Sequence, residues 1–215
     1  MDLFDGIDPP QTGRELLAEG ALLLRGFALA RAGELIAAIA LVTTDAPFRH
    51  MQTPGGRQMS VAMSNCGRAG WVSDRAGYRY APDDPATGKP WPAMPGCFRA
   101  LACAAAAEAG YPGFQPDVCL INRYEPGTKL SLHQDRDERD FTQPIVSVSL
   151  GLPASFQFGG ARRSDPLRRH ALRHGDVLVW GGPSRLFHHG ILALKDGTHP
   201  ELGRMRLNLT FRRAL

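Results

Sequence analysis

The second half of the sequence alternates between short runs of β-forming residues and turn residues, and this pattern limits the possible folds more than any other feature. Leucine, aromatic or β-branched residues recur at a period of two in eight runs: 118–125, 129–135, 145–151, 155–160, 167–173, 176–182, 185–192 and 204–213. A period of two is typical of strands with one face toward a core, and the glycine and proline between the runs favour turns. Eight short strands at this spacing predict an antiparallel sandwich or jelly roll.

Two helices are predicted before these strands. Residues 31–42 (RAGELIAAIALV) place apolar side chains at helical spacing, so we expect a helix that ends before Pro47. A second helix is expected from about Pro95 to Ala109, where Gly110 stops it. The fold class is therefore mainly β with α elaboration, with a jelly-roll core over 117–213.

Residues 48–95, between the two helices, differ in composition from the rest of the chain. They contain paired aromatic residues and frequent glycine and proline, as in GWVSD and GYRYAPDDPATGKPWPAMP. We interpret this segment as hairpins that form a surface lobe rather than core. Because 215 residues is the size of one well-cored domain, residues 1–215 are interpreted as a single domain.

Composition excludes several classes of protein. Hydrophobic residues at 43% and charged residues at 21% describe a globular chain rather than a disordered one. No apolar run reaches the roughly 18 to 20 residues that span a bilayer. The first ten residues lack a basic segment followed by an apolar one, so we expect no secretory signal and a cytoplasmic location.

The four cysteines contain no Cys-x-x-Cys pair and are expected to be free thiols. A net charge of +4 permits a nucleic-acid partner without requiring one.

The stretch LHQDRDE contains candidate metal ligands. If the strand continues through it, His133, Asp135 and Asp137 share one face, because successive side chains alternate. A histidine in a strand is more often an ordinary polar residue than a ligand, so this motif alone proves nothing. Either His188 or His189 would supply a further ligand, and His189 is favoured if Phe187 faces the core. Two imidazoles and one carboxylate on one side of a metal are typical of non-haem Fe(II) oxygenases.

Polar residues also recur at a period of two in the last predicted strand. Arg206, Asn208, Thr210 and Arg212 share one face there, and Asn122 and Tyr124 share a face of an earlier strand. Each row alone is compatible with a solvated outer face. A buried row of this kind requires an anionic partner, since buried guanidinium groups need one, and a small dicarboxylate supplies two negative charges.

Taken in order, these motifs resemble the AlkB family of Fe(II)- and 2-oxoglutarate-dependent dioxygenases, which repair alkylated nucleic-acid bases. The matching motifs are N-R-Y at 122–124, H-Q-D at 133–135, the histidine before Gly190 and R-x-N-x-T-F-R at 206–212, and the likeness extends from about residue 20 to residue 213. The resemblance implies a double-stranded β-helix, or jelly-roll, core with N-terminal helices and a nucleotide-recognition lobe over 48–95.

The resemblance also implies a role for individual residues. It implies that His133, Asp135 and His189 hold the iron. It implies that Arg206 pairs with the distal carboxylate of 2-oxoglutarate, assisted by Tyr124, while Asn122, Asn208 and Arg212 complete the pocket at the metal-chelating end. By the same likeness Trp71 stacks on the target base, Tyr78 and Tyr80 line the nucleotide-recognition lobe, and Asp137 and Arg163 approach the base or its backbone.

The function implied is oxidative demethylation of bases such as 1-methyladenine and 3-methylcytosine in DNA and also in RNA. The reaction would use Fe(II), O2 and 2-oxoglutarate and release succinate, carbon dioxide and formaldehyde. Single-stranded DNA is the expected partner because a base inside a duplex must first be extruded. We expect a monomer that binds no membrane. The five arginines and two histidines of 161–174 form a solvated loop by default, and contact phosphates if they lie near the site.

Two other functions are compatible with parts of this pattern. The first is an Fe(II)/2-oxoglutarate hydroxylase of a small molecule or a protein side chain, which would not depend on Trp71. The second is a non-enzymatic jelly-roll module that binds sugar or nucleic acid and no iron.

Overall fold

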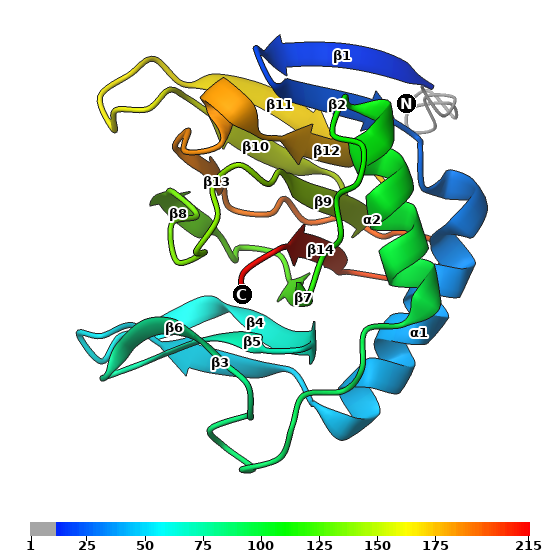
Figure 1. The fold of residues 1–215 in the computed structure, drawn as a ribbon. Coiled ribbons are helices and arrows are strands. Elements are labelled where there is room, and N and C mark those ends of the chain that lie inside the picture. Colours follow the sequence, from blue (N-terminus) through cyan, green and yellow to red (C-terminus); the bar gives the residue numbers. More distant parts are fainter. Residues whose placement is uncertain (1–11) are drawn as a thin grey trace.

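The computed structural model describes residues 12–215, in which two β-sheets face each other and two helices cover the outer side of one sheet (Figure 1). Each of the eight predicted runs contains a strand. These strands are β7 (Val118–Tyr124), β8 (Leu130–His133), β9 (Ile145–Gly151), β10 (Ala154–Phe158), β11 (Arg168–Leu172), β12 (Val177–Trp180), β13 (His189–Ile191) and β14 (Arg206–Arg212). The prediction of a mainly β, antiparallel fold is confirmed.

The larger sheet has eight strands in the order β1-β2-β12-β9-β14-β7-β4-β3, and the smaller sheet has four in the order β11-β10-β13-β8. Strands β1 (Gly13–Ala18), β2 (Ala21–Arg25), β3 (Arg49–Gln52) and β4 (Gln58–Gly67) extend the larger sheet at its two edges. A separate hairpin is formed by β5 (Gly70–Asp74) and β6 (Gly77–Ala81). The strand pairs of residues 12–215 are antiparallel, as expected for a jelly roll.

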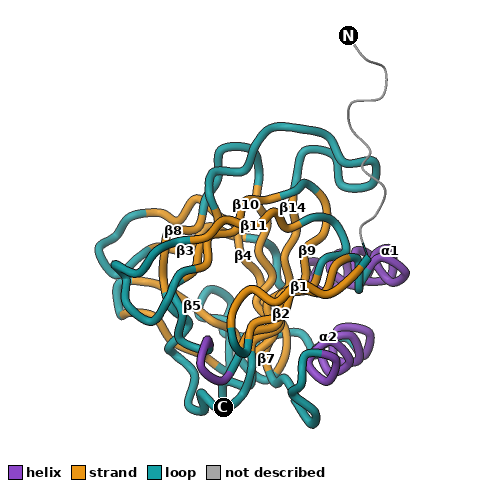
Figure 2. The backbone as a smooth tube through the Cα atoms, turned by 90° about the horizontal axis from the view of Figure 1, so that it is seen from above, coloured by secondary structure: helices purple, strands orange, loops and turns teal. Residues whose placement is uncertain are grey.

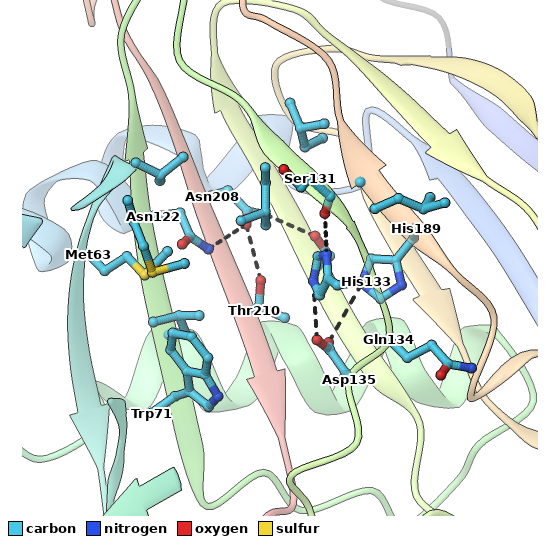
Figure 3. Close-up of a pocket in the computed structure, with 18 of the residues that line it drawn as sticks. Met63, Trp71, Asn122, Ser131, His133, Gln134, Asp135, His189, Asn208 and Thr210 are labelled. Atoms are coloured by element: carbon cyan, nitrogen blue, oxygen red, sulfur yellow. Dashed lines mark hydrogen bonds and ion pairs between the residues drawn. The ribbon is translucent and has the colours of Figure 1, made fainter. Parts of the chain in front are cut away.

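The central strand β14 shows why the larger sheet has one apolar and one polar face. Leu207, Leu209 and Phe211 are buried in the core cluster under the helices. The alternating residues, Asn208 and Thr210 among them, are also buried but point to the opposite face, toward the smaller sheet (Figure 3). The alternation in the sequence therefore separates a hydrophobic core from a polar interior.

The helices close the apolar face. In α1 (Ala32–Asp45) the buried residues Leu35, Ala38, Ile39 and Val42 follow a spacing of three and four, which makes one apolar stripe. In α2 (Gly96–Glu108) the buried residues Phe98, Leu101, Ala102, Ala105 and Ala106 do the same. Both helices lie side by side outside the strands, as Figure 2 also shows. Gly110 ends α2 with a φ of 89°, and the amide of Tyr111 donates to the carbonyl of Ala106, as in a Schellman motif.

Three expectations need correction. The sequence patterns did not predict β1 and β2, or the short 3-10 helices η1 (Leu29–Arg31) and η2 (Gly182–Ser184). Strand β4 falls in the segment that the sequence predicts to be a surface lobe, yet its residues Val61, Ala62, Met63 and Cys66 are buried because β4 pairs with β7 inside the larger sheet. Strand β8 ends at His133, so the alternation expected to carry Asp135 and Asp137 does not reach them.

Two further observations bear on the expectations from composition. Within residues 12–215, no helix has the length and apolar character to cross a membrane. The expectation about a secretory signal falls on the first ten residues, which lie outside the described part. All four cysteines are unpaired.

Candidate active site

A cavity of about 680 Å³ lies on the polar side of the larger sheet and is bounded by the smaller sheet and the β5–β6 hairpin. The tertiary structure brings all the sequence-predicted site residues to the wall of this one cavity. These are Trp71, Tyr78, Tyr80, Asn122, Tyr124, His133, Asp135, Asp137, Arg163, His189, Arg206, Asn208 and Arg212.

His133, Asp135 and His189 form a metal-binding triad (Figure 3). One ligand atom from each lies within 4.8 Å of the others. His133 Nε2 is 3.5 Å from Asp135 Oδ1, and His189 Nε2 is 3.8 Å from Asp135 Oδ2. The two histidines are direct partners across β8 and β13, which explains why residues 56 positions apart in sequence meet.

Backbone carbonyls fix the tautomer of both histidines. His133 Nδ1 lies 2.8 Å from the carbonyl of Ser131, and His189 Nδ1 lies 3.0 Å from the carbonyl of Phe187. Because a carbonyl only accepts, each Nδ1 carries the proton and each Nε2 presents its lone pair to the centre of the triad. Metal-ligating histidines are oriented in this way in general.

The charge states of the triad also suit a divalent cation. Burial lowers the pKa of His189 to about 4, and the neighbouring His133 adds to this effect, so His189 is neutral at pH 7. Burial alone would raise the pKa of Asp135, but the guanidinium of Arg212 and the two histidines hold it well below its usual value. For His133, burial is outweighed by the Asp135 carboxylate, which raises its pKa. A carboxylate that stays ionised beside two imidazoles is a donor set that iron(II) accepts.

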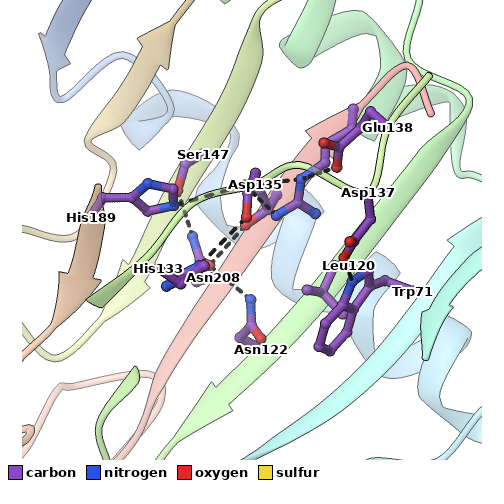
Figure 4. A network of polar contacts seen from close by, with 12 residues as sticks. Trp71, Leu120, Asn122, His133, Asp135, Asp137, Glu138, Ser147, His189 and Asn208 are labelled. Atoms are coloured by element: carbon purple, nitrogen blue, oxygen red, sulfur yellow. Dashed lines mark hydrogen bonds and ion pairs between the residues drawn. The ribbon is translucent and has the colours of Figure 1, made fainter. Parts of the chain in front are cut away.

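The structure resolves the choice between the two adjacent histidines. His188 lines the cavity, but its Nδ1 lies 3.3 Å from the carbonyl of Gly160 and it is not part of the triad. Asp137, which was expected to share a strand face with His133, is exposed and accepts a hydrogen bond of 2.8 Å from Trp71 Nε1. Asp137 therefore belongs to the aromatic side of the cavity, as Figure 4 shows.

The polar row on β14 lies inside the protein beside the triad, and its members hydrogen-bond to β7, to β9 and to the triad. Asn122 donates from Nδ2 to Asn208 Oδ1 at 3.0 Å, and Asn208 Nδ2 donates to Ser147 Oγ at 2.9 Å. Arg212 Nε and Nη2 donate to Asp135 Oδ2 at 3.1 and 2.7 Å. Arg212 thus contacts the metal ligand itself, a partner that the sequence patterns did not indicate.

Arg206 differs from its neighbours because most of its donors are unused. The side chain is 1% exposed, and only Nη2 has a hydrogen bond, at 3.0 Å to Ser149 Oγ. Its Nε and Nη1 find no acceptor among the described residues, while its guanidinium lies 4.9 Å from the centre of the Tyr124 ring. A buried cation with unpaired donors at a cavity wall is a receptor for an anion.

The β5–β6 hairpin supplies the aromatic wall of the cavity. Trp71 is paired with Tyr80 across the hairpin and lies diagonal to Tyr78, and the Trp71 and Tyr78 rings stack at 5.6 Å with an interplanar angle of 14°. Tyr80 is tied inward, because its hydroxyl donates to Glu138 Oε1 at 2.6 Å. On the opposite side, Arg163 Nη1 donates to the carbonyl of Leu132 at 2.9 Å.

Several residues around the cavity were not identified from the sequence. Ser147 and Ser149 alternate in the otherwise apolar strand β9, and this period of two was a usable signal for their inward position. Glu138 lies outside the predicted runs, and Gln134 and Arg185 lie at the ends of two of them, so no pattern marked these three residues.

The site has two imidazoles and one carboxylate between the two sheets of a jelly roll, and beside them a buried arginine with unused donors. This arrangement defines the class of non-haem Fe(II) oxygenases that take an anionic cosubstrate. Comparison with known proteins agrees with this class. The family model described as the 2OG-Fe(II) oxygenase superfamily matches residues 20–212. The chain is 61% identical over 214 residues to the alpha-ketoglutarate-dependent dioxygenase AlkB of Escherichia coli (strain K12), with 100% of this chain and 98% of that protein covered.

Two further relatives extend the comparison. The solved structure of OsALKBH1 matches with a TM-score of 0.83 at 30% identity, covering 94% of this chain and 100% of that chain. The DNA N(6)-methyladenine demethylase ALKBH1D of Arabidopsis thaliana is 39% identical over 117 residues, which is 49% of this chain and 26% of that protein. The chain therefore belongs to the AlkB family within the 2OG-Fe(II) oxygenase superfamily and is an Fe(II)- and 2-oxoglutarate-dependent dioxygenase. The alternative of a non-enzymatic binding module is wrong.

Proposed function

We propose that this dioxygenase removes N-methyl groups from bases such as 1-methyladenine and 3-methylcytosine in DNA, and also in RNA. The observation that carries this proposal is the Trp71–Tyr78 stack in the wall of the cavity that contains the metal triad. A flat aromatic pair suits a planar base better than a flexible aliphatic substrate. The demethylase name of the Arabidopsis relative supports the same substrate class.

We assign the cosubstrate to the polar end of the cavity. Arg206 pairs with the distal carboxylate of 2-oxoglutarate, because its two unpaired donors match a carboxylate, and Tyr124 lies against its guanidinium. Asn122, Asn208 and Arg212 surround the metal-chelating end. When bound, iron(II) with 2-oxoglutarate and dioxygen supplies the oxidising power that hydroxylates the methyl group, and succinate, carbon dioxide and formaldehyde leave.

We assign base recognition to the hairpin. Methylation at the pairing edge gives these bases a positive charge at neutral pH, and a cationic ring on Trp71 gains about 0.5 to 2 kcal/mol of cation–π attraction. Asp137 holds the indole by its N–H and places a carboxylate at the same wall, which favours a cationic base. Tyr80 fixes the hairpin through Glu138. Extruding a base from a duplex costs about a few kcal/mol, so we expect single strands to be preferred.

Cations at the mouth of the cavity suit the nucleic-acid backbone. Arg57, Lys129, Arg136 and Arg163 line the cavity and are exposed, and none of the four has a carboxylate partner within residues 12–215. Phosphate contacts from this rim would make binding weaken as salt concentration rises.

We also assign the parts of the chain. Residues 1–215 are one dioxygenase domain, in which 48–95 is the nucleotide-recognition lobe, chiefly through the β5–β6 hairpin, and 117–213 is the catalytic core. We expect the enzyme to act as a monomer in the cytoplasm, where nucleic acid is available.

Mass spectrometry of a methylated oligonucleotide tests the proposal. A single strand bearing 1-methyladenine or 3-methylcytosine is incubated with the protein, Fe(II), 2-oxoglutarate and air, beside a His133→Ala control. We expect the strand to lose the mass of one CH2 group with the intact protein alone. Steady succinate formation without a mass change would instead favour a hydroxylase of a small molecule or a protein side chain.

A further inference from the structure

Arg185 bridges the two segments that carry iron ligands, although it touches no ligand atom. It follows η2 and precedes the ligand His189 by four residues in the chain. Its side chain is buried, and its donors reach the loop that joins β8 to β9. Nε donates to the carbonyl of Gln143 at 3.0 Å, Nη1 to the carbonyl of Asp135 at 2.8 Å, and Nη2 to Glu138 Oε2 at 3.0 Å.

The loop between β8 and β9 depends on these hydrogen bonds because it is not part of either sheet. Strand β8 ends at His133, and residues 134–144 have no regular secondary structure. Asp135 therefore lies outside the ladder of backbone hydrogen bonds that fixes the two histidine ligands. Its carbonyl is held by Arg185 and its carboxylate by Arg212. A further hydrogen bond joins the same two segments, since Gln134 Nε2 donates to the carbonyl of Leu186.

The charges around Arg185 are balanced within the protein. Glu138 accepts from Arg185 Nη2, lies 3.3 Å from Arg212 Nε, and accepts from the Tyr80 hydroxyl. Asp135 and Glu138 supply two carboxylates, and Arg185 and Arg212 supply two guanidiniums, all of them buried. Figure 4 shows Glu138 and Asp135 in this polar network. The two guanidinium charges therefore balance the two carboxylate charges inside the protein.

We infer that Arg185 is a positioning residue that holds the β8–β9 loop so that the Asp135 carboxylate stays in ligating position, and that it thereby sets the affinity of the site for a divalent cation. Outer partners of metal ligands typically change metal affinity by about ten- to a hundredfold when they are removed. This inference concerns the metal site and holds for any substrate of the dioxygenase.

The test compares three variants of the full chain with the natural protein. Arg185→Met removes the three hydrogen bonds, and Arg185→Lys keeps the buried charge but not the planar fork of donors. Arg25→Met is the matched control. Arg25 is also mostly buried and pairs with Glu15 at 2.6 Å and Asp176 at 2.7 Å, but on β2, outside the contacts of the triad.

Two measurements are made on each folded variant without 2-oxoglutarate: Mn²⁺ binding by calorimetry, and hydrogen exchange of the amides of 134–143 in metal-free protein. We expect Arg185→Met to bind Mn²⁺ about ten- to a hundredfold more weakly, with faster exchange in the loop, and Arg185→Lys to show the same direction. Arg25→Met lowers thermal stability but leaves both readouts unchanged. If Arg185→Met does not fold, Arg185→Lys decides the question. Natural Mn²⁺ affinity in either folded Arg185 variant, or an equal loss in Arg25→Met, overturns the inference.

Discussion

Replacing Arg206 by methionine tests the proposed cosubstrate site through thermal stability. The substitution removes a buried guanidinium of which two nitrogens have no acceptor within residues 12–215, and it leaves a side chain of similar length. We expect the variant to be about as stable as the natural protein without ligand. We also expect it to lose most of the stabilisation that 2-oxoglutarate gives.

The magnitudes follow from the contacts of Arg206. Two unpaired donors cost about 1 to 3 kcal/mol each in the natural protein. The charged hydrogen bond to Ser149 returns about 1.5 to 3 kcal/mol, and the contact with the Tyr124 ring returns about 0.5 to 2 kcal/mol. These contributions nearly cancel, so ligand-free stability should change by less than about 2 kcal/mol.

The stabilisation that 2-oxoglutarate gives should distinguish Arg206→Met from the natural protein. With 2-oxoglutarate at about 100 times its Kd, the natural protein gains about 2.7 kcal/mol, which for a chain of this size raises Tm by about 5 to 11 °C. Losing a buried charge pair costs at least about 2 kcal/mol of binding, so the variant should gain less than about 1 kcal/mol at the same concentration.

Scanning calorimetry with Mn²⁺, with and without 2-oxoglutarate, measures both quantities. Mn²⁺ replaces Fe²⁺ so that no oxidation occurs during the scan. Arg25→Met is the control, because it removes another buried arginine and should keep the full ligand-induced shift. The reasoning is refuted if Arg206→Met keeps more than half of that shift, or if its ligand-free Tm falls by more than about 8 °C.

Three further predictions address the base, the core and pH. Trp71→Ala should lower kcat/KM for a methylated oligonucleotide by about 5- to 150-fold, since stacking contributes about 1 to 3 kcal/mol per base. Steady-state kinetics should show an unchanged KM for 2-oxoglutarate. Phe211→Ala, which removes a fully buried ring, should destabilise the fold by about 3 to 5 kcal/mol in urea unfolding. Burial, together with the nearby His199, lowers the pKa of His174 in the folded protein. At mildly acidic pH the unfolded chain therefore binds more protons than the folded one, and the free energy of unfolding should fall as pH drops below about 6.5. His174→Asn keeps an acceptor for the Gly151 amide, and its unfolding free energy should depend less on pH between 7 and 5; an equal dependence would contradict this cause.

Much of the site could be predicted because its residues obey the alternation of strands. The row of Arg206, Asn208, Thr210 and Arg212 faces inward because β14 is a regular strand with Leu207, Leu209 and Phe211 on the other face. The same rule located Asn122 and Tyr124 on β7. It failed at Asp137, because β8 ends at His133 and the alternation ends with it.

The sequence by itself determined the eight core strands and the two helices, since these depend on local periodicity. The members of the metal triad followed from the motifs that resemble the AlkB family, because periodicity left His188 and His189 open and β8 ends before Asp135. Only the tertiary structure decided that β4 is core, that Arg212 pairs with Asp135, and that Arg185 holds the loop beside it. Arg212 and Asp135 are 77 residues apart in sequence. Their contact depends on how two sheets pack face to face, and no pattern along a single strand contains that information.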